Sequence, residues 1–256
     1  MSDTKITAET FRAMKARGEK IAALTAYDFP MAKLLDEAGI PLLLVGDSLG
    51  MVVLGYPDTT HVTMAEIEHH TRAASRARPK AFLGADLPFK SYETVETAVT
   101  NARRLVAAGA DYVKAEGGQE ILPQVRAIIA EGIPFCGHLG MLPQHVLEEG
   151  GYHIKGKKDK EHQKLVADAG VLADAGAFAV VLELVAAPVS LEITRLIPIP
   201  TIGIGSGPST DGQILVISDL IGAFPWFTPR FVKPRIHTGA DIKTTVGEWQ
   251  RSLNVS

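Results

Sequence analysis

The stretch of residues 95–116, VETAVTNARRLVAAGADYVKAE, decides the fold class. Its first part places apolar residues at helical spacing and so predicts a helix over Val95–Ala108; these residues are Val95, Val99, Ala102 and Val106. Gly109 follows, and glycine accepts the left-handed conformation that ends a helix. The apolar segment Tyr112–Glu116 comes next and is typical of a buried strand. The stretch therefore predicts one helix that is compactly joined to one strand.

The same alternation recurs along the chain. Short apolar runs are followed by longer segments with helical spacing, and glycine ends several of these segments. Continuously apolar strands are typical of a parallel sheet that is covered on both faces. The predicted strands are Ile21–Ala26, Leu42–Gly46, Ala81–Asp86, Tyr112–Glu116, Phe135–His138, Ala179–Glu183, Thr201–Ile204 and, less regular than the others, Ile214–Ile217. The predicted helices include Met31–Ala38, Met64–Ser75, Val95–Ala108, Glu120–Glu131, Glu161–Ala175 and Ser190–Leu196.

Eight strands that alternate with helices favour an α/β protein with a closed (β/α)8 TIM barrel. A doubly wound open sheet is the alternative, because period and composition do not distinguish a closed sheet from an open one. The last two strands are too close for an ordinary crossover helix, and Gly140–Lys160 forms a long polar insertion of the kind that often serves as a lid. With no convincing linker, we expect a single domain over residues 1–256 with a short N-terminal helical extension.

Composition excludes several classes of protein. The chain has 256 residues, 46% hydrophobic and 21% charged, with a net charge of -3, so nucleic acid and anionic membranes are not expected partners. The single cysteine, Cys136, rules out an intramolecular disulfide framework. The polar start Met1–Lys5 leads into no signal-type apolar core, and no apolar run is long enough to span a bilayer. We therefore expect a cytoplasmic protein.

Ionisable residues gather at the ends of five consecutive predicted strands. In barrel enzymes the reactive groups lie at the carboxyl ends of the strands, so these residues predict one shared site. They are Asp47, Asp86, Lys114 with Glu116, His138 and Glu183.

Three of these residues, Asp47, Asp86 and Glu116, would offer hard oxygen ligands to a divalent cation, and Mg²⁺ suits them best. The alternative is that Asp47 and Asp86 cap the following helices. Lys114 and Glu116 are two residues apart and share one side of a strand, where they could form an ion pair instead of serving a ligand.

Glu183 ends a strongly apolar strand, and such surroundings raise the pKa of a carboxyl group and suit a general base; a buried structural role is the alternative. His138 either orients a carboxylate, binds substrate or is only hydrogen-bonded structure. Cys136 lies inside an apolar strand without an activating base, which argues against a nucleophile. The basic segment Lys155–Lys160 is typical of a solvated face.

Several of these segments resemble the ketopantoate hydroxymethyltransferase family, and the similarity runs from about Ile6 to about Thr238. Blocks that occur in this order are far more specific than any isolated motif. They are Thr25-Ala26-Tyr27-Asp28, Val45-Gly46-Asp47-Ser48-Leu49-Gly50-Met51, Ala85-Asp86-Leu87-Pro88-Phe89, Val113-Lys114-Ala115-Glu116-Gly117-Gly118, Cys136-Gly137-His138-Leu139-Gly140, Gly150-Gly151-Tyr152, Leu182-Glu183 and Thr210-Asp211-Gly212-Gln213.

The resemblance implies a Mg²⁺-dependent barrel of the phosphoenolpyruvate/pyruvate group. It implies transfer of a one-carbon unit from the cosubstrate 5,10-methylenetetrahydrofolate to 3-methyl-2-oxobutanoate, giving 2-dehydropantoate and tetrahydrofolate in pantothenate synthesis. The expected partners are thus a 2-oxo acid, a folate and further copies of the chain, in a homo-oligomer expected to be a decamer. By motif position, Asp47 and Asp86 match metal ligands that also contact the substrate, and Glu116 matches a carboxylate that acts on the metal through water. Ser48 and Lys114 match keto-acid-binding residues. His138 matches a residue at the site, and Glu183 matches the catalytic base.

Two other functions share these residues. One is a Mg²⁺-dependent lyase of the same barrel group that cleaves a carbon–carbon bond in a 2-oxo acid. The other is a barrel that keeps its pocket as a non-catalytic binding module. The joint presence of four carboxylates and a lysine argues against it; these residues are Asp47, Asp86, Lys114, Glu116 and Glu183. The residues that grip the folate are not identifiable from the sequence.

Overall fold

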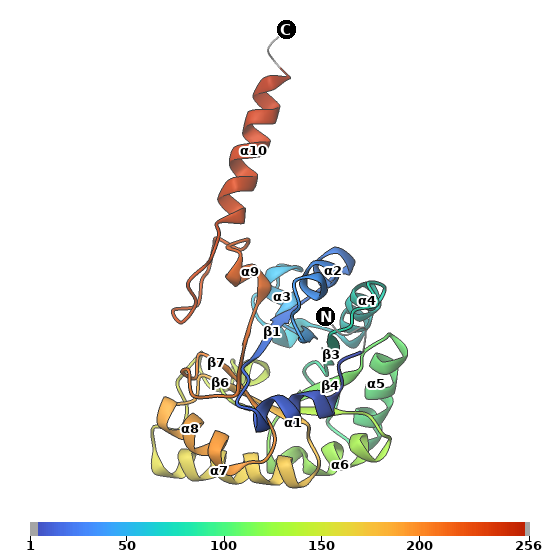
Figure 1. The fold of residues 1–256 in the computed structure, drawn as a ribbon, viewed down its shortest axis with the longest axis vertical. Coiled ribbons are helices and arrows are strands. Elements are labelled where there is room, and N and C mark those ends of the chain that lie inside the picture. Colours follow the sequence, from blue (N-terminus) through green and yellow to red (C-terminus); the bar gives the residue numbers. More distant parts are fainter. Residues whose placement is uncertain (1–4, 254–256) are drawn as a thin grey trace. The chain divides into compact units, whose positions relative to one another are not determined.

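A computed structural model describes residues 5–253. The expectation of no signal sequence was based on Met1–Lys5. Residues Met1–Thr4 of that segment lie outside the described residues. The strands close into a barrel in the order β1 to β8, and helices surround it (Figure 1). This closed order confirms the predicted (β/α)8 barrel and excludes the doubly wound open sheet.

All eight strands lie within two residues of their predicted bounds. The strands are β1 (Ile21–Thr25), β2 (Leu42–Val45), β3 (Phe82–Asp86), β4 (Tyr112–Glu116), β5 (Phe135–Gly140), β6 (Ala179–Glu183), β7 (Thr201–Ile204) and β8 (Gly212–Leu215). The prediction for the last strand, Ile214–Ile217, was wrong by two residues. A Cβ atom on Gly212 would lie 2.4 Å from the Ile21 carbonyl oxygen, so glycine is needed where β8 begins against β1. A search for apolar runs passes over such a position.

Helices alternate with the strands up to β7. They are α1 (Ala8–Ala16), α2 (Phe29–Glu37), α3 (Leu49–Val52), α4 (Met64–Ser75), α5 (Val95–Ala107), α6 (Leu122–Ala130), α7 (Asp159–Asp174), α8 (Ala187–Leu196), α9 (Ile217–Leu220) and α10 (Thr238–Ser252), with the 3-10 turns η1 (Thr59–His61), η2 (Gln119–Ile121) and η3 (Pro143–His145). A loop over residues 205–211 joins β7 to β8 without a helix, which explains their short spacing. Asp211 holds this loop, because its carboxylate accepts hydrogen bonds from the Thr201 amide and the Lys15 ammonium.

Helix α5 buries a face different from the predicted one. Val106 is 40% exposed, whereas Ala98, Ala102 and Leu105 are fully buried. Those three residues also follow helical spacing, and two of them are alanines, whose small side chains let a helix approach its neighbours closely. Gly109 ends the segment as predicted, with a φ of 108°.

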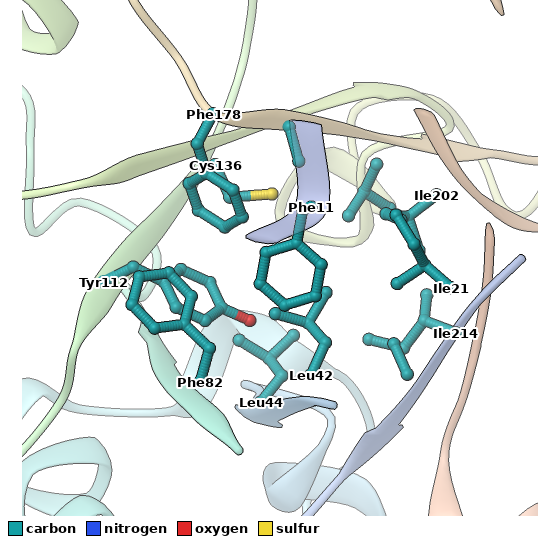
Figure 2. Packing of buried hydrophobic residues seen from close by; sticks show 13 residues of the cluster. Phe11, Ile21, Leu42, Leu44, Phe82, Tyr112, Cys136, Phe178, Ile202 and Ile214 are labelled. Carbon is teal, nitrogen blue, oxygen red and sulfur yellow. The ribbon is translucent and has the colours of Figure 1, made fainter. Parts of the chain in front are cut away.

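The predicted N-terminal helical extension, α1, contributes to the core of the barrel. Phe11 is buried in a cluster of residues from the strands (Figure 2). Its ring centroid lies 5.9 Å from those of both Phe82 and Phe178, and Tyr112 packs against the same two rings. The apolar part of the barrel interior is therefore filled by side chains from the strands and from α1.

The described chain divides into two compact units, one extending to Ile214 and the other beginning at Leu215. In α10 only Gly239 is buried, so this helix brings few side chains to a core. Within residues 5–253, no helix combines the length and apolarity that a bilayer crossing requires.

Candidate active site

Along β3 to β6, the side chains on one face of each strand change from apolar to ionisable toward the carboxyl end of the barrel. On β4, Tyr112 belongs to the buried apolar cluster, and Lys114 and Glu116 follow on the same face of the strand. The same change occurs on the neighbouring strands, from Phe82 to Asp86, from Cys136 to His138 and from Val181 to Glu183. One buried layer of polar groups therefore lies above the apolar core.

Lys114 connects two strands within this layer. Its Nζ lies 2.9 Å from Asp86 Oδ1 and 3.2 Å from His138 Nδ1. Burial alone would lower the pKa of Lys114, but the negative charges of Asp86, Asp47 and Glu116 outweigh it and raise that pKa. The ammonium is therefore charged. Among the described side chains it pairs with Asp86, not with Glu116 as the alternative from strand spacing proposed.

His138 links this lysine to Glu183. Burial and the charge of Lys114 lower the pKa of His138, so the imidazole is neutral. Because an ammonium group can only donate, we assign Nδ1 as the acceptor and place the proton on Nε2. Nε2 lies 3.2 Å from Glu183 Oε2, within reach of a hydrogen bond from the imidazole to the carboxylate.

Glu183 is the last residue of β6, and its side chain is 13% exposed, the most accessible carboxylate of the layer. Burial raises its pKa, while the His138 ring beside it opposes that shift. A carboxylate with a raised pKa that still reaches solvent can accept a proton from a bound molecule.

Asp47 and Asp86 meet at the ends of β2 and β3. Asp86 Oδ2 accepts a hydrogen bond from the Asp47 amide at 3.0 Å, and Asp47 Oδ2 accepts one from Gln144 Nε2 at 2.8 Å. Neither carboxylate caps a helix, in contrast to Asp28, which accepts a hydrogen bond from the Met31 amide at the start of α2. The capping alternative is therefore wrong for both residues.

Glu116 is held through one of its two oxygens. Its Oε2 accepts a hydrogen bond from the Gln144 amide at 3.0 Å, while among the described residues its buried Oε1 has no hydrogen-bond partner. Burial raises the pKa of Glu116 to about 7. Burial and the charges of Asp86 and Glu116 likewise raise the pKa of Asp47. These shifts arise because three carboxylates share one buried space with a single lysine.

This excess of negative charge fits a divalent cation. Over residues 5–253 no three His, Cys, Asp or Glu side chains already form a ligand set for a metal. Mg²⁺, however, commonly takes only one or two carboxylates and keeps several waters, which matches Asp47 and Asp86. One oxygen of Glu116 already accepts from the Gln144 amide, which suits an action through water. The metal role of all three residues stays a prediction.

Three further residues lie at the site but were not predicted from the sequence as site residues: Tyr27, Gln144 and Tyr92. Tyr27 lies just after β1, and its hydroxyl is 2.8 Å from Ser48 Oγ, so it fixes the predicted keto-acid-binding serine. Gln144 lies in η3, and Tyr92 donates a hydrogen bond to its side chain at 2.7 Å. Tyr27 could have been predicted, because it lies at a strand end within one of the blocks that resemble the family. Gln144 and Tyr92 lie in loops where the sequence shows no such pattern.

The remaining candidates have structural explanations. Cys136 is buried in the apolar cluster, and burial raises the pKa of its thiol to about 12, which is unsuited to a nucleophile. In the basic segment, Lys155 pairs with Glu149 at 2.8 Å. The exposed remainder of that segment agrees with a solvated face; it comprises Lys157, Lys158 and Lys160.

Comparison with solved structures places the fold in a known class. A phosphonopyruvate hydrolase in complex with oxalate and Mg²⁺ matches with a TM-score of 0.63 and 15% identity, covering 82% of this chain and 80% of that chain. A 2,3-dimethylmalate lyase of the PEP mutase/isocitrate lyase superfamily matches with a TM-score of 0.62 and 17% identity, covering 86% and 84%. The protein is thus a (β/α)8 barrel with the same fold as these two enzymes, and it carries a polar layer at the carboxyl ends of its strands.

Closer relatives define the family. The family model for ketopantoate hydroxymethyltransferase matches residues 5–255. The 3-methyl-2-oxobutanoate hydroxymethyltransferase of Moorella thermoacetica is 53% identical over 90% of this chain and 86% of its own length. That of Ignicoccus hospitalis is 50% identical over 97% and 95%. The chain belongs to the ketopantoate hydroxymethyltransferase family.

Proposed function

We propose that the protein is a Mg²⁺-dependent 3-methyl-2-oxobutanoate hydroxymethyltransferase of pantothenate biosynthesis. It uses 5,10-methylenetetrahydrofolate as the one-carbon donor and forms 2-dehydropantoate and tetrahydrofolate. The names of relatives at about 50% identity support the activity. The observation that carries the proposal is the continuous link from Glu183 through His138 to Lys114 and Asp86, because it joins a base to the groups that hold a keto acid.

The chemistry explains why these residue types are needed. The hydrogen on C3, next to the ketone, is poorly acidic, so its removal requires positive charge near the keto oxygen. Asp47 and Asp86 would hold Mg²⁺, with Glu116 acting through water, and the cation would supply that charge when bound.

The side chains of the protein carry out the remaining steps. Glu183 takes the C3 proton. Water cleaves the two C–N bonds of the folate's methylene group, so tetrahydrofolate leaves with a hydrogen on each of these nitrogens and the carbon is released as formaldehyde. The electron pair left on C3 forms a bond to that carbon, and the resulting alkoxide oxygen takes the proton held by Glu183. Lys114 has three donors, one of which reaches His138 while the ammonium pairs with Asp86, so within residues 5–253 a donor is left for the keto acid. Ser48, held by Tyr27, orients the same substrate.

Deuterium exchange tests this proposal. We expect the metal-loaded protein in D₂O to exchange the C3 hydrogen of 3-methyl-2-oxobutanoate, followed by NMR, and to form product when the folate is added. A 2-oxo acid with no hydrogen on C3, 3,3-dimethyl-2-oxobutanoate, is the matched control. Folded, metal-loaded protein that gives neither exchange nor product would contradict the proposal and return the lyase and the binding module to consideration.

The assembly and location are part of the same proposal. We expect a homo-oligomer, with a decamer as the specific form, located in the cytoplasm. Sedimentation velocity at micromolar concentration measures the assembly directly, and a monomer there would contradict it.

A further inference from the structure

Gln144 occupies a buried position between the predicted metal carboxylates. It lies in η3, after β5, and only 2% of it is exposed. Its Nε2 donates to Asp47 Oδ2 at 2.8 Å and to the Leu87 carbonyl at 3.0 Å, while its backbone amide donates to Glu116 Oε2 at 3.0 Å. One residue thus contacts two of the three carboxylates.

The orientation of the Gln144 amide is determined by its neighbours. The Tyr92 hydroxyl donates to Gln144 Oε1 at 2.7 Å, so the amide nitrogen must face Asp47 and Leu87. Both side-chain donors and the acceptor are therefore satisfied, and the amide has no equally good alternative orientation.

The neutral side-chain amide of Gln144 leaves the negative charge of Asp47 available to a cation. A lysine or arginine in this place would neutralise Asp47 and compete with a cation, whereas an amide fixes one carboxylate oxygen and leaves the charge unchanged. Among the described residues, nothing donates a hydrogen bond to the other oxygen, Asp47 Oδ1. That oxygen is therefore available to a ligand.

We propose that Gln144 is a positioning residue that holds Asp47 and Glu116 in place for a divalent cation, with Tyr92 fixing its amide. The inference rests on the proposed function, because Mg²⁺ is the cation considered. Groups that orient metal ligands in this way typically change metal affinity about 10–100-fold when they are removed.

The test measures Mg²⁺ binding to the protein alone by titration calorimetry. Gln144→Met keeps the length of the side chain but removes its hydrogen bonds, and we expect Mg²⁺ affinity to fall at least about tenfold. The matched control is Gln163→Met. Gln163 is an exposed residue of α7 that takes no part in the site, so Mg²⁺ affinity should not change.

A second variant separates positioning from general damage to the fold. Tyr92→Phe leaves Gln144 in place and removes the hydroxyl that orients its amide, so we expect a smaller loss of Mg²⁺ affinity. The same hydroxyl also lies 3.2 Å from the Glu116 carbonyl oxygen. In the Gln144→Met background the substitution should therefore cost less affinity than it does in the unaltered chain, because the part that acts through Gln144 is already lost. This variant also tests the inference alone should Gln144→Met fail to fold.

Each outcome decides the inference. Folded Gln144→Met or Tyr92→Phe protein that binds Mg²⁺ as tightly as the unaltered chain overturns it, and so does additivity in the double variant. An unaltered chain that binds no Mg²⁺ overturns it as well. If the unaltered chain binds Mg²⁺ and the variants weaken binding, but no C3 exchange occurs, then the inference stands and the proposed function fails.

Discussion

Glu183 and His138 show how a single side chain acquires its properties from its surroundings. The glutamate ends an apolar strand, and burial raises its pKa, while the neutral imidazole reaches it through the nitrogen that carries the proton. The imidazole is in turn kept neutral by burial and by Lys114. The surroundings of Glu183, the proposed base, thus come from three neighbouring strands.

The role of Glu183 is tested by Glu183→Gln. The amide keeps the size of the side chain but cannot take a proton, so turnover should fall at least about 100-fold while Mg²⁺ affinity stays unchanged. Steady-state kinetics and calorimetry measure the two quantities. Glu192→Gln makes the same chemical change at an exposed residue of α8 and should leave both unchanged. Near-normal turnover of Glu183→Gln would remove Glu183 from this role.

Elements of the barrel depend on single close contacts between strands. A Cβ atom on Gly84 of β3 would lie 2.1 Å from the ring of Tyr112 on β4, so only glycine fits beside that ring. The Tyr112 hydroxyl continues across to the Leu43 carbonyl at 3.1 Å. One aromatic side chain thereby spans three adjacent strands just below the polar layer.

Two glycine substitutions test this packing. Gly84→Ala should lower the free energy of unfolding by about 1–3 kcal/mol or more, because the ring cannot move aside without a shift of the strand. Gly170→Ala in α7, where nothing lies within 4 Å of the added atom, should raise it by up to about 1 kcal/mol. Denaturant titration measures both, and equal effects would contradict the packing account.

Helix α1 is the second element with a testable contact. Phe11→Ala removes the ring that packs on Phe82 and Phe178 and should cost about 3–5 kcal/mol of unfolding free energy. Phe29→Ala, which truncates a 46% exposed phenylalanine on α2, should change it by less than about 0.5 kcal/mol. A small effect at Phe11 would mean that α1 is not part of the core.

At the scale of the whole molecule, the barrel concentrates negative charge at one end of its interior. Asp47, Asp86 and Glu116 lie there beside the buried Lys114, whereas the neighbouring His138 is neutral. The burial that creates the site therefore also destabilises it until a cation is present.

Mg²⁺ should accordingly stabilise the folded protein. At about 100 times its dissociation constant, a ligand that binds only the native state adds about 2.7 kcal/mol, which for a chain of this size raises the melting temperature by roughly 5–10 °C. Differential scanning calorimetry at one scan rate, with NaCl at equal ionic strength as the control, measures the shift. Equal effects of the two salts would contradict the cation site.

The amino-acid sequence by itself determined the alternation of helices and strands, the places where most of them end, and the row of ionisable residues at the strand ends. These features follow from local periodicity, from glycine at helix ends and from the two-residue repeat of strands. The blocks that resemble the family could also be recognised from the sequence, because each lies within a short stretch of the chain.

Only the tertiary structure decided which of these residues touch. Asp47 and Gln144 are 97 positions apart and meet because the barrel closes, and Lys114 pairs with Asp86 because of the register between β3 and β4. The start of β8 at Gly212 and the packing of Phe11 likewise depend on contacts between distant segments. Such contacts are set by packing and strand register in three dimensions, and they leave no periodic trace along the chain.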